Sequence, residues 1–548
     1  MLIIASLVVK IISALYKIPL TSFIGATGRG YFAVAYNIFM PIHIIIMGSM
    51  PIALSQLVSR FNANSNKSMV RALKISANKI FFVVGIVGSL LVLLFSVPYC
   101  RYIAKSPNSI YTVLALVPTV LFSTLSASYR GFFEGFMNMT PTSVSQTIDA
   151  VVKAVFGLLF AKLSMLFLYN SYLNGNLAIF NNITNDKDAL SIIYPITTAF
   201  AMLGVSLGSL ASYLYLVFYS KNHYYNDNHV SKKTIILASK KLITFSFSIM
   251  LSCIVQSVFQ FLDTASVQLA LASFSTNELR IILAESLNYC KIKDNDLYTY
   301  IYGLFNSAVD FKNIIPGITM AIGVCAVPAI SSAYNTKNKQ RLDTVSNMIF
   351  KYTIMLSTFC GGFLCLESST ILNLFYRSNA DIVVGCQKLV ALFGLTAFSY
   401  SLAGSAIFCV QAIGMPKKSI PPFVVGGIIR IVINYLFISD ITANLYANVI
   451  AEFLGYLLIA IWNICIYVKY TNVNIIKFKS VVLPFNVAVL SFFVYKNIIN
   501  FAQITAFSYT TLIIKIVLYM VIYLVCAIIF RVIDINQIKN VLKFKNHY

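Results

Sequence analysis

The sequence predicts an all-α protein that crosses a membrane with about fourteen helices. Hydrophobic residues make up 59% of the 548 residues and charged residues only 11%, whereas a soluble globular chain carries about 25% charged residues. The mean hydropathy is +0.81. Apolar stretches of about 20 residues, the length that crosses the hydrocarbon core of a bilayer, follow one another along the chain. The connections between them are too short to hold a soluble domain.

The candidate spans are taken in chain order. The first contains Lys10 and Lys17 and has no small-residue cleavage site, so we expect a transmembrane helix rather than a removable signal peptide. Polar, basic or turn-forming residues separate the later spans. The expected helices cover residues 2–24, 31–58, 76–97, 109–130, 141–165, 190–220, 240–272, 298–334, 346–366, 383–411, 416–439, 442–468, 478–500 and 507–530.

Residues 25–60 and 302–339 share a pattern. Each segment starts at glycine-containing residues and continues as an apolar span, and in each the matching motif is followed by a polar run rich in Asn and Lys. Pro51-Ile-Ala-Leu-Ser55 matches Pro328-Ala-Ile-Ser331, and the two prolines are 277 residues apart, about half of the chain. We therefore expect two related halves, with the function carried out between them. The glycines after residue 24 follow a helix rather than a strand, so they indicate a turn and not a nucleotide-binding loop.

The formal net charge of +24 is explained by membrane topology. With the N-terminus in the cytoplasm, 24 of the 41 Lys and Arg residues fall in cytoplasmic connections and 11 in outer connections. This distribution follows the positive-inside rule and predicts that both termini are cytoplasmic. Contact with anionic lipid head groups accounts for the remaining basic character, so nucleic acid is not an expected partner.

Six of the 41 Lys and Arg residues are assigned to neither set of connections, and all six fall inside the expected spans. A Lys or Arg near the bilayer centre costs about 2.5–3.5 kcal/mol on insertion scales, so such residues usually face a protein interior or a wet cavity. Snorkelling from helix ends is the simpler expectation for two of them. The deeper three are expected to line a cavity. The six are Lys17 and Lys515, with snorkelling expected, Lys10, Lys153 and Arg430, which lie deeper, and Lys312.

The repeat relates two of these cations. Pro141 opens the fifth expected helix and Pro416 opens the eleventh, and Lys153 and Arg430 follow them 277 residues apart. Each half therefore places one cation at a similar depth in its equivalent helix. Two such helices facing each other would present a positive pair to a central cavity.

Acidic residues and one histidine also fall within the spans. Asp149 precedes Lys153 by four residues, so the two share a helix face and could either neutralise each other or act in the cavity. Asp310 and Lys312 flank the start of the apolar part of the eighth helix. His43 lies in the middle of the second span, where a hydrogen-bonded helix contact is more common than a proton relay. Two further span acids are Asp263 and Glu452.

Enzyme chemistry is poorly supported by the sequence. It contains no HExxH motif, no nucleophile elbow and no paired-carboxylate loop. The ten cysteines show neither a CxxC pair nor metal-like spacing to the four histidines, so we interpret them as small core residues. We expect no cofactor and no metal site. A lipid-dependent glycosyltransferase or polymerase is the enzyme-class alternative.

Several segments match a known family in order and across nearly the whole chain. The sequence resembles the polysaccharide transporter branch of the multidrug/oligosaccharidyl-lipid/polysaccharide exporter superfamily, which includes MurJ-like lipid II flippases and stage V sporulation protein B-like proteins. The segments that carry the resemblance are Lys10-Ile-Ile-Ser-Ala-Leu-Tyr-Lys-Ile-Pro-Leu20, residues 25–31, Pro51-Ile-Ala-Leu-Ser55, Pro141-Thr-Ser-Val-Ser-Gln146 and Pro328-Ala-Ile-Ser331.

The resemblance implies an architecture of two bundles. An N-terminal six-helix bundle would occupy residues 1–220 and a C-terminal six-helix bundle residues 240–470, related by an axis along the membrane normal. Two additional helices would lie in 478–530, followed by a basic cytoplasmic tail at 531–548. Parallel repeats of this kind place the substrate between the halves near the bilayer midplane and move it by rocking.

The resemblance also implies site residues. Lys10 falls where the family has a first-helix cation, His43 lies near a second-helix cation, and Asp310 and Lys312 lie near the eighth-helix acid–base pair. A groove between the last two helices would hold a lipid tail. Lysine instead of arginine at position 10 removes bidentate phosphate recognition, so the head-group contact is expected to differ here.

The function implied by the resemblance is a flippase for an undecaprenyl-diphosphate-linked saccharide. Buried cations suit a pyrophosphate between lipid and sugar, and an inside-negative potential favours outward movement of an anion by about 2.3 kcal/mol per charge per 100 mV. The expected partners are this substrate, membrane lipids and cell-wall assembly proteins, at the bacterial cell membrane. The expected cavity residues are Lys10, Lys17, His43, Lys153, Asp310, Lys312 and Arg430, with Asp149 and Asp263 as coupling or structural acids.

Two other functions remain open from sequence. A drug/cation antiporter of the same superfamily would need an acidic coupling site, such as Asp263 or Asp149, and the excess of buried cations argues against it. A non-transporting scaffold in envelope assembly is the third class.

Overall fold

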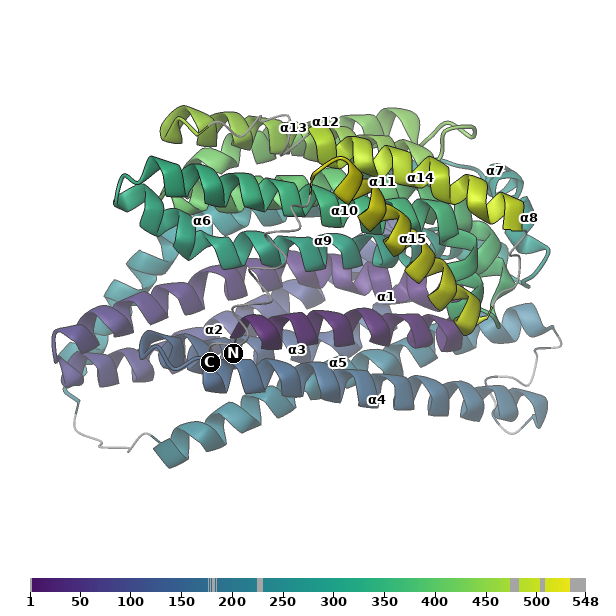
Figure 1. Cartoon of the computed structure of the whole chain (residues 1–548). Helices are drawn as coiled ribbons and strands as arrows, with labels where there is room; N and C mark the ends of the chain where they lie inside the picture. Colours follow the sequence, from purple (N-terminus) through teal and green to yellow (C-terminus); the bar gives the residue numbers. More distant parts are fainter. Residues whose placement is uncertain are drawn as a thin grey trace. The chain divides into compact units, whose positions relative to one another are not determined.

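A computed structural model of the chain consists of long α-helices (Figure 1). It describes residues 2–532, apart from 176, 178, 180–182, 184, 224–229, 474–481 and 503–507. The elements in chain order are α1 Leu2–Ala63, α2 Lys67–Pro98, η1 Tyr99–Ile103, α3 Ser109–Gly135, α4 Thr140–Leu173, α5 Asp186–His223, α6 Lys232–Leu271, α7 Thr276–Ile282, α8 Ala284–Leu287, η3 Asp294–Asp296, α9 Leu297–Asn335, α10 Lys339–Phe375, α11 Ala380–Ala412, η4 Pro416–Ser419, α12 Ile420–Phe437, α13 Tyr446–Thr471, α14 Val482–Ala502 and α15 Tyr509–Ile529.

The predicted all-α membrane architecture is confirmed. Among the described residues, 13 helices are long and apolar enough to cross a membrane. The prediction of about fourteen counted the two parts of α1 separately. These parts meet at Gly25, whose φ of 66° and ψ of −179° interrupt the helix. Glycine adopts this conformation without the steric penalty that a side chain would bring. The turn predicted for the glycine-rich segment is therefore confined to Gly25.

Two compact units can be separated within the chain. Unit 1 comprises Met1–Ser307 and Asn434–Asn444, and unit 2 comprises Ala308–Ile433 and Leu445–Tyr548. In unit 1, α1 packs against α2 to α6, and α4 packs along α5. In unit 2, α10 packs against α11, and α11 packs against α13. The two six-helix bundles and their boundaries at 1–220 and 240–470 stay a prediction.

The starts of the two repeated segments meet inside unit 1. A Cβ placed on Gly30 of α1 would lie 2.0 Å from the Thr299 carbonyl oxygen of α9, and one on Gly303 would lie 1.8 Å from the Ala26 carbonyl oxygen. Only glycine permits such close approach of two backbones. The glycines that mark the start of each repeat therefore form the contact between α1 and the first turns of α9.

The two C-terminal helices pack onto α10 in unit 2. Tyr519 of α15 is fully buried and stacks on Phe359 of α10, with ring centroids 5.2 Å apart. Val487 of α14 and Met355 of α10 belong to the same apolar cluster. Figure 1 shows α14 and α15 in yellow. This packing brings polar side chains of α10 and α15 close to one another.

Each unit surrounds its repeat-related cation in a similar way. In unit 1, a Cβ on Gly208 of α5 would lie 3.2 Å from the Lys153 Cβ of α4. In unit 2, a Cβ on Gly455 of α13 would lie 2.5 Å from the Arg430 Cγ of α12. Both cations therefore stand on helices that approach a neighbouring helix closely at a glycine. This local similarity supports the predicted relation between the halves.

Candidate functional site: a buried cation cluster

Arg130 joins three helices in the interior of unit 1. Its side chain comes from α3, and the residue is only 9% exposed. Nε donates to the Ser145 hydroxyl of α4 at 3.0 Å, and an Nη2 hydrogen is donated to the Ser212 hydroxyl of α5 at 2.8 Å. Two neutral hydroxyls orient the guanidinium without removing its positive charge. Arg130 is one of the 24 cations counted above in cytoplasmic connections, whereas the structure places it within α3, where tertiary packing buries it.

The Pro141-Thr-Ser-Val-Ser-Gln146 motif supplies partners for the end of α3. Its Thr142 hydroxyl donates to Glu134 Oε1 at 3.1 Å, while its Ser145 accepts from Arg130. Pro141 lies in the first turn of α4, where a missing backbone N–H leaves no hydrogen bond unmade. The motif thus starts α4 and fixes two ionisable side chains of α3.

Lys153 lies about two turns further along α4. Its Nζ donates to the Ser13 hydroxyl of α1 at 3.4 Å. Asp149, one turn earlier, interacts electrostatically with both Lys153 and Arg130. The predicted Asp149–Lys153 interaction is therefore present, but one carboxylate is shared between two cations. Glu134 also interacts electrostatically with Arg130, so Arg130 and Lys153 face two carboxylates between them.

Two predicted cavity residues of α1 face the same region. Lys17 interacts electrostatically with Lys153. His43 interacts with both Arg130 and Lys153, and its ring stacks on Phe39 with centroids 4.9 Å apart. The Nδ1 atom of His43 is buried without a hydrogen-bond partner in the described part of the chain. The helix contact expected for His43 is thus an aromatic one.

Arg29 adds a fourth cation shortly after the break at Gly25. The residue is 3% exposed, and its Cζ lies 5.0 Å from the centroid of the Phe32 ring. Tyr36 interacts electrostatically with both Arg29 and Asp149. Arg29 is one of the 11 cations counted above in outer connections, whereas the structure buries it within α1. We define the unit 1 cation cluster as the four cations Lys17, Arg29, Arg130 and Lys153 together with the acids Asp149 and Glu134.

The composition of the unit 1 cation cluster suits an anionic ligand. Four of its six ionisable side chains are cations, and two of those are arginines. A guanidinium presents a planar fork of donors that matches phosphate oxygens, while a lysine supplies a mobile point charge. Cations within membrane-spanning helices are costly and usually mark a ligand or ion pathway.

Lys312 has a different environment in unit 2. Its Nζ donates to both carboxylate oxygens of Glu452 on α13, at 2.5 and 2.7 Å. The Lys312 side chain is 4% exposed and the Glu452 side chain 9% exposed. Nζ also lies 4.8 Å from the centroid of the Phe393 ring. The charge of this predicted cavity residue is therefore balanced within unit 2.

Arg430 lies among aromatic side chains in unit 2. Its Cζ is 4.5 Å from the centroid of the Tyr456 ring, and Tyr456 stacks on Tyr400 with centroids 4.3 Å apart. Tyr400 interacts electrostatically with both Arg430 and Glu452. A guanidinium over an aromatic face gains a cation–π attraction that grows when water is excluded. Lys153 and Arg430 lie in different units, so the facing pair stays a prediction.

Three further residues were predicted to belong to the site: Asp263, Asp310 and Lys10. Asp263 is 7% exposed, and Asn434 Nδ2 donates to its Oδ1 at 3.3 Å. The same amide donates to the Ser266 hydroxyl at 3.1 Å. Asp310 is 9% exposed. Lys10 belongs to α1, but its side chain lies outside the described residues, so its role stays a prediction.

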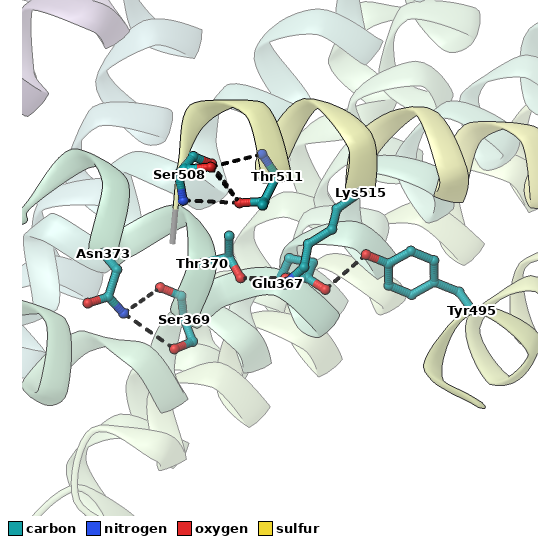
Figure 2. Close-up of polar contacts among 8 residues, drawn as sticks. All are labelled: Glu367, Ser369, Thr370, Asn373, Tyr495, Ser508, Thr511 and Lys515. Carbon is teal, nitrogen blue, oxygen red and sulfur yellow. Dashed lines mark hydrogen bonds and ion pairs between the residues drawn. The ribbon is translucent and has the colours of Figure 1, made fainter. Parts of the chain in front are cut away.

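A second buried ion pair joins the C-terminal helices to α10 (Figure 2). Lys515 Nζ of α15 donates to Glu367 Oε2 at 2.8 Å and to Thr370 Oγ1 at 3.0 Å. The Tyr495 hydroxyl of α14 donates to Glu367 Oε1 at 2.9 Å. Lys515 is only 4% exposed. The snorkelling predicted for Lys515 is therefore wrong.

Glu367 stands where α10 is interrupted. Its φ of −114° and ψ of 21° are not helical, although helix continues on both sides. The Thr370 hydroxyl, one turn later, donates to Glu367 Oε2 at 2.6 Å. The carboxylate thus receives hydrogen bonds from three helices at one point. Glu367 was not among the predicted site residues because the expected span ended at residue 366, whereas α10 continues to Phe375.

A polar surface feature lies outside the spans in unit 1. Lys291 Nζ lies 2.9 Å from Asp186 Oδ2, at the start of α5, and Lys293 Nζ lies 3.0 Å from Asp188 Oδ1. The hydrogen bond and charge of Asp186 raise the pKa of Lys291. These side chains are exposed, so the pairs attach a loop to α5 rather than form a buried site.

Comparisons with known proteins agree with the resemblance. A family model described as "Polysaccharide biosynthesis protein" matches residues 1–180. Stage V sporulation protein B of Bacillus subtilis (strain 168) is 22% identical over 552 residues, covering 98% of this chain and 96% of that protein. The lipid II flippase MurJ of the same organism is 23% identical over 473 residues, covering 82% of this chain and 78% of that protein. The chain is a homologue of both proteins.

The fold is shared with a solved structure of this branch. A structure of lipid II flippase MurJ in an inward closed conformation matches with a TM-score of 0.66 and 14% sequence identity. The match covers 96% of this chain and 98% of that chain. The predicted likeness to MurJ and stage V sporulation protein B is confirmed, and with it the multi-pass membrane fold.

Proposed function

We propose that this MurJ-like homologue is a flippase for an undecaprenyl-diphosphate-linked saccharide, such as lipid II or a polysaccharide repeat unit. The observation that carries the proposal is the unit 1 cation cluster. It holds four cations and two carboxylates within helices that cross the membrane, and Arg130 is oriented there by Ser145 and Ser212. The likeness to MurJ and stage V sporulation protein B supports the same function.

The chemistry of the cluster matches the diphosphate of such a substrate. A diphosphate is the one strongly anionic part of a molecule whose other parts are a prenyl chain and a neutral or weakly charged saccharide. Arg130 has guanidinium hydrogens beyond the two that Ser145 and Ser212 accept, and these can be donated to phosphate oxygens, while Lys153 can add a point charge. The prenyl chain can stay in lipid while the head group occupies the protein interior.

The buried carboxylates argue against a drug/cation antiporter. Such a transporter needs a carboxylate that is available to bind a cation or proton. Glu452 and Glu367 each bind a lysine, and Asp149 interacts with two cations. Asp263 accepts from Asn434. This arrangement favours a ligand that brings negative charge.

The proposal includes an orientation in the bacterial cell membrane. The excess of Lys and Arg in alternate connections places both termini in the cytoplasm by the positive-inside rule. Movement of the diphosphate outward then proceeds with the membrane potential. Cell-wall assembly proteins that use the substrate on the outer side are the proposed protein partners.

A rescue experiment tests the proposal. Cells depleted of their own lipid II flippase are supplied with this chain or with Lys153→Gln or Arg130→Gln, at equal protein level in the membrane. We expect rescue by the unchanged chain and loss of rescue by both variants, because each removes one cation from the cluster. Accessibility of lipid II at the outer surface is measured in the same cells.

The matched control is Lys162→Gln, which removes an exposed lysine from the same helix as Lys153. It should rescue normally. Normal rescue by Lys153→Gln and Arg130→Gln would contradict the site. Failure of the unchanged chain on lipid II, with activity on another diphosphate-linked saccharide, would change the substrate and keep the site.

A further inference from the structure

An apolar cavity of about 190 Å³ lies between α1, α2 and α6 in unit 1. Ile45, Ile46 and Met50 of α1 and Ile80 and Val84 of α2 line two sides, and α6 lines the third from Leu242 to Met250. The volume exceeds the roughly 150 Å³ of an engineered apolar cavity that stays dry and binds benzene. The space is therefore large enough for part of a hydrocarbon chain.

Helix contacts define the two ends of this cavity. Toward the start of α6, the Ser76 hydroxyl of α2 donates to the Ile235 carbonyl oxygen at 3.0 Å. Further along α6, the Cys253 Sγ lies 3.1 Å from the position of a Cβ on Gly48 of α1. In the region that separates these two contacts, the side chains of α1, α2 and α6 leave the cavity unfilled. The cavity is thus a built feature of the helix packing.

Ser246 is the polar side chain of the cavity wall. The residue is 6% exposed, and its Oγ has no hydrogen-bond partner in the described residues. A buried hydroxyl without a partner costs free energy. An occupant with an acceptor oxygen at this depth would satisfy it, whereas a pure hydrocarbon would not.

The cavity opens toward the membrane side of α6. Ile243 is 56% exposed and Phe247 is 60% exposed, and both line the cavity. Hydrocarbon surrounds a membrane-spanning protein at the depth of such apolar, exposed side chains. The available occupant is therefore an acyl chain that enters from the bilayer.

Basic residues lie at one end of the cavity. Lys79 directly precedes Ile80, and Lys240 and Lys241 directly precede Leu242, and all three lysines are exposed. The Lys241 Nζ lies 4.8 Å from the centroid of the Phe61 ring near the end of α1, so this ammonium group points away from the cavity toward the helix ends. Ser246 lies about 7.5 Å deeper along α6 than Lys241, at a rise of about 1.5 Å per residue.

We propose that this cavity binds one anionic glycerophospholipid. An acyl chain occupies the apolar space, an ester carbonyl oxygen accepts from Ser246 Oγ, and the phosphate lies near Lys79, Lys240 and Lys241. Along α6 the lysines come first, Ser246 follows within the cavity wall, and Phe247 and Met250 lie beyond it, which is the order of phosphate, ester and acyl chain along such a lipid. Basic residues beside membrane helices attract anionic head groups. The site is separate from the unit 1 cation cluster and does not depend on the transported substrate.

A fluorescence experiment on the full chain tests the proposal. The chain has one tryptophan, Trp462, so Trp462→Phe with Phe247→Trp leaves a single reporter at the cavity mouth. The protein is placed in bilayers with increasing fractions of phosphatidylglycerol or phosphatidylcholine carrying brominated acyl chains. We expect half-maximal quenching at a several-fold lower fraction of brominated phosphatidylglycerol than of brominated phosphatidylcholine.

Variants separate the parts of the site. Lys79→Gln with Lys240→Gln and Lys241→Gln should make the two lipids equal, while Lys232→Gln with Lys233→Gln, an exposed pair earlier in α6, should leave the preference unchanged. Val84→Phe, which fills the cavity, should remove the preferential quenching. If that variant fails to fold, the lysine variants still decide the outcome.

Two results would overturn the proposal. Equal quenching by both lipids in the reporter protein would mean ordinary contact with surrounding lipid. Displacement of brominated phosphatidylglycerol by a stoichiometric amount of undecaprenyl phosphate would assign the cavity to a prenyl chain instead.

Discussion

Lys312 of α9 and Glu452 of α13 form an ion pair in unit 2, with Nζ 2.5 Å from Oε2 and both side chains at most 9% exposed. The residues are 140 positions apart in the sequence. The pair balances charge within unit 2, whereas the unit 1 cation cluster keeps a positive excess. We therefore expect a structural role for the Lys312–Glu452 pair, and we propose ligand binding for the unit 1 cation cluster alone.

Removing the acid of this pair should destabilise the protein. Glu452→Gln leaves the Lys312 ammonium group buried without a carboxylate, and breaking a buried pair in this way costs about 3–5 kcal/mol. We expect a lower midpoint of thermal unfolding in detergent. The double variant Lys312→Met with Glu452→Met should regain most of that loss, because apolar replacement of both partners is often neutral.

The same double variant separates structure from transport. If Lys312 only joins α9 to α13, the stable double variant should also rescue flippase-depleted cells. A stable double variant that fails to rescue would show that Lys312 contacts the substrate during transport.

The Lys515–Glu367 pair should be energetically important for the C-terminal helices. Lys515→Met should lower the free energy of unfolding by about 3–5 kcal/mol, because Glu367 stays buried. Tyr495→Phe removes one hydrogen bond to a charged group and should cost about 1.5–3 kcal/mol. Unfolding in detergent measures both. Lys496→Met, an exposed change on α14, should stay within about 0.5 kcal/mol, and equal losses for all three variants would contradict the assignment.

Gly303 should tolerate no side chain. An alanine Cβ would lie 1.8 Å from the Ala26 carbonyl oxygen, so α9 and α1 would have to move apart, at a cost of about 1–3 kcal/mol or more. Gly317→Ala on the same helix is the control, since no atom lies within 4 Å of its Cβ position. We expect lower folded yield and a lower unfolding midpoint for Gly303→Ala only. Equal behaviour of the two variants would exclude the close contact.

Asp263 should have a structural role. In Asp263→Asn, the amide oxygen can still accept from Asn434 Nδ2, which now lies 3.3 Å from Oδ1. We therefore expect normal rescue of flippase-depleted cells and a stability change of about 1 kcal/mol or less. Loss of rescue at equal protein level would instead assign Asp263 as a coupling acid, as an antiporter requires.

The transmembrane architecture could be predicted because lipid leaves the backbone few options. Backbone polar groups in hydrocarbon must be satisfied within each segment, so long apolar runs form helices regardless of their neighbours. The expected spans accordingly reappear as α1 to α6 and α9 to α15. The break at Gly25 was also foreseeable, since the glycines there mark the end of an apolar run.

The site was only partly predictable because its geometry depends on tertiary contacts. Arg29 and Arg130 lie near the ends of the expected spans, so they were counted with the connections between helices. Their burial depends on contacts with other helices, which the sequence does not show. The i, i+4 spacing revealed Asp149 and Lys153, which share one helix. No local spacing could reveal that Lys515 binds Glu367, since 148 positions separate them.

Two partners of the buried Glu367 carboxylate come from the last two helices, so a shortened chain would lack them. In a shortened protein that ends before α14, neither Lys515 nor Tyr495 would be present, and the buried carboxyl group of Glu367 would lose both of these partners at the break in α10. Such a truncation should insert and accumulate poorly, and Glu367→Gln should improve its accumulation. The last two helices therefore supply polar partners that a buried carboxyl group of α10 requires, so we expect that they cannot be removed without loss of stability.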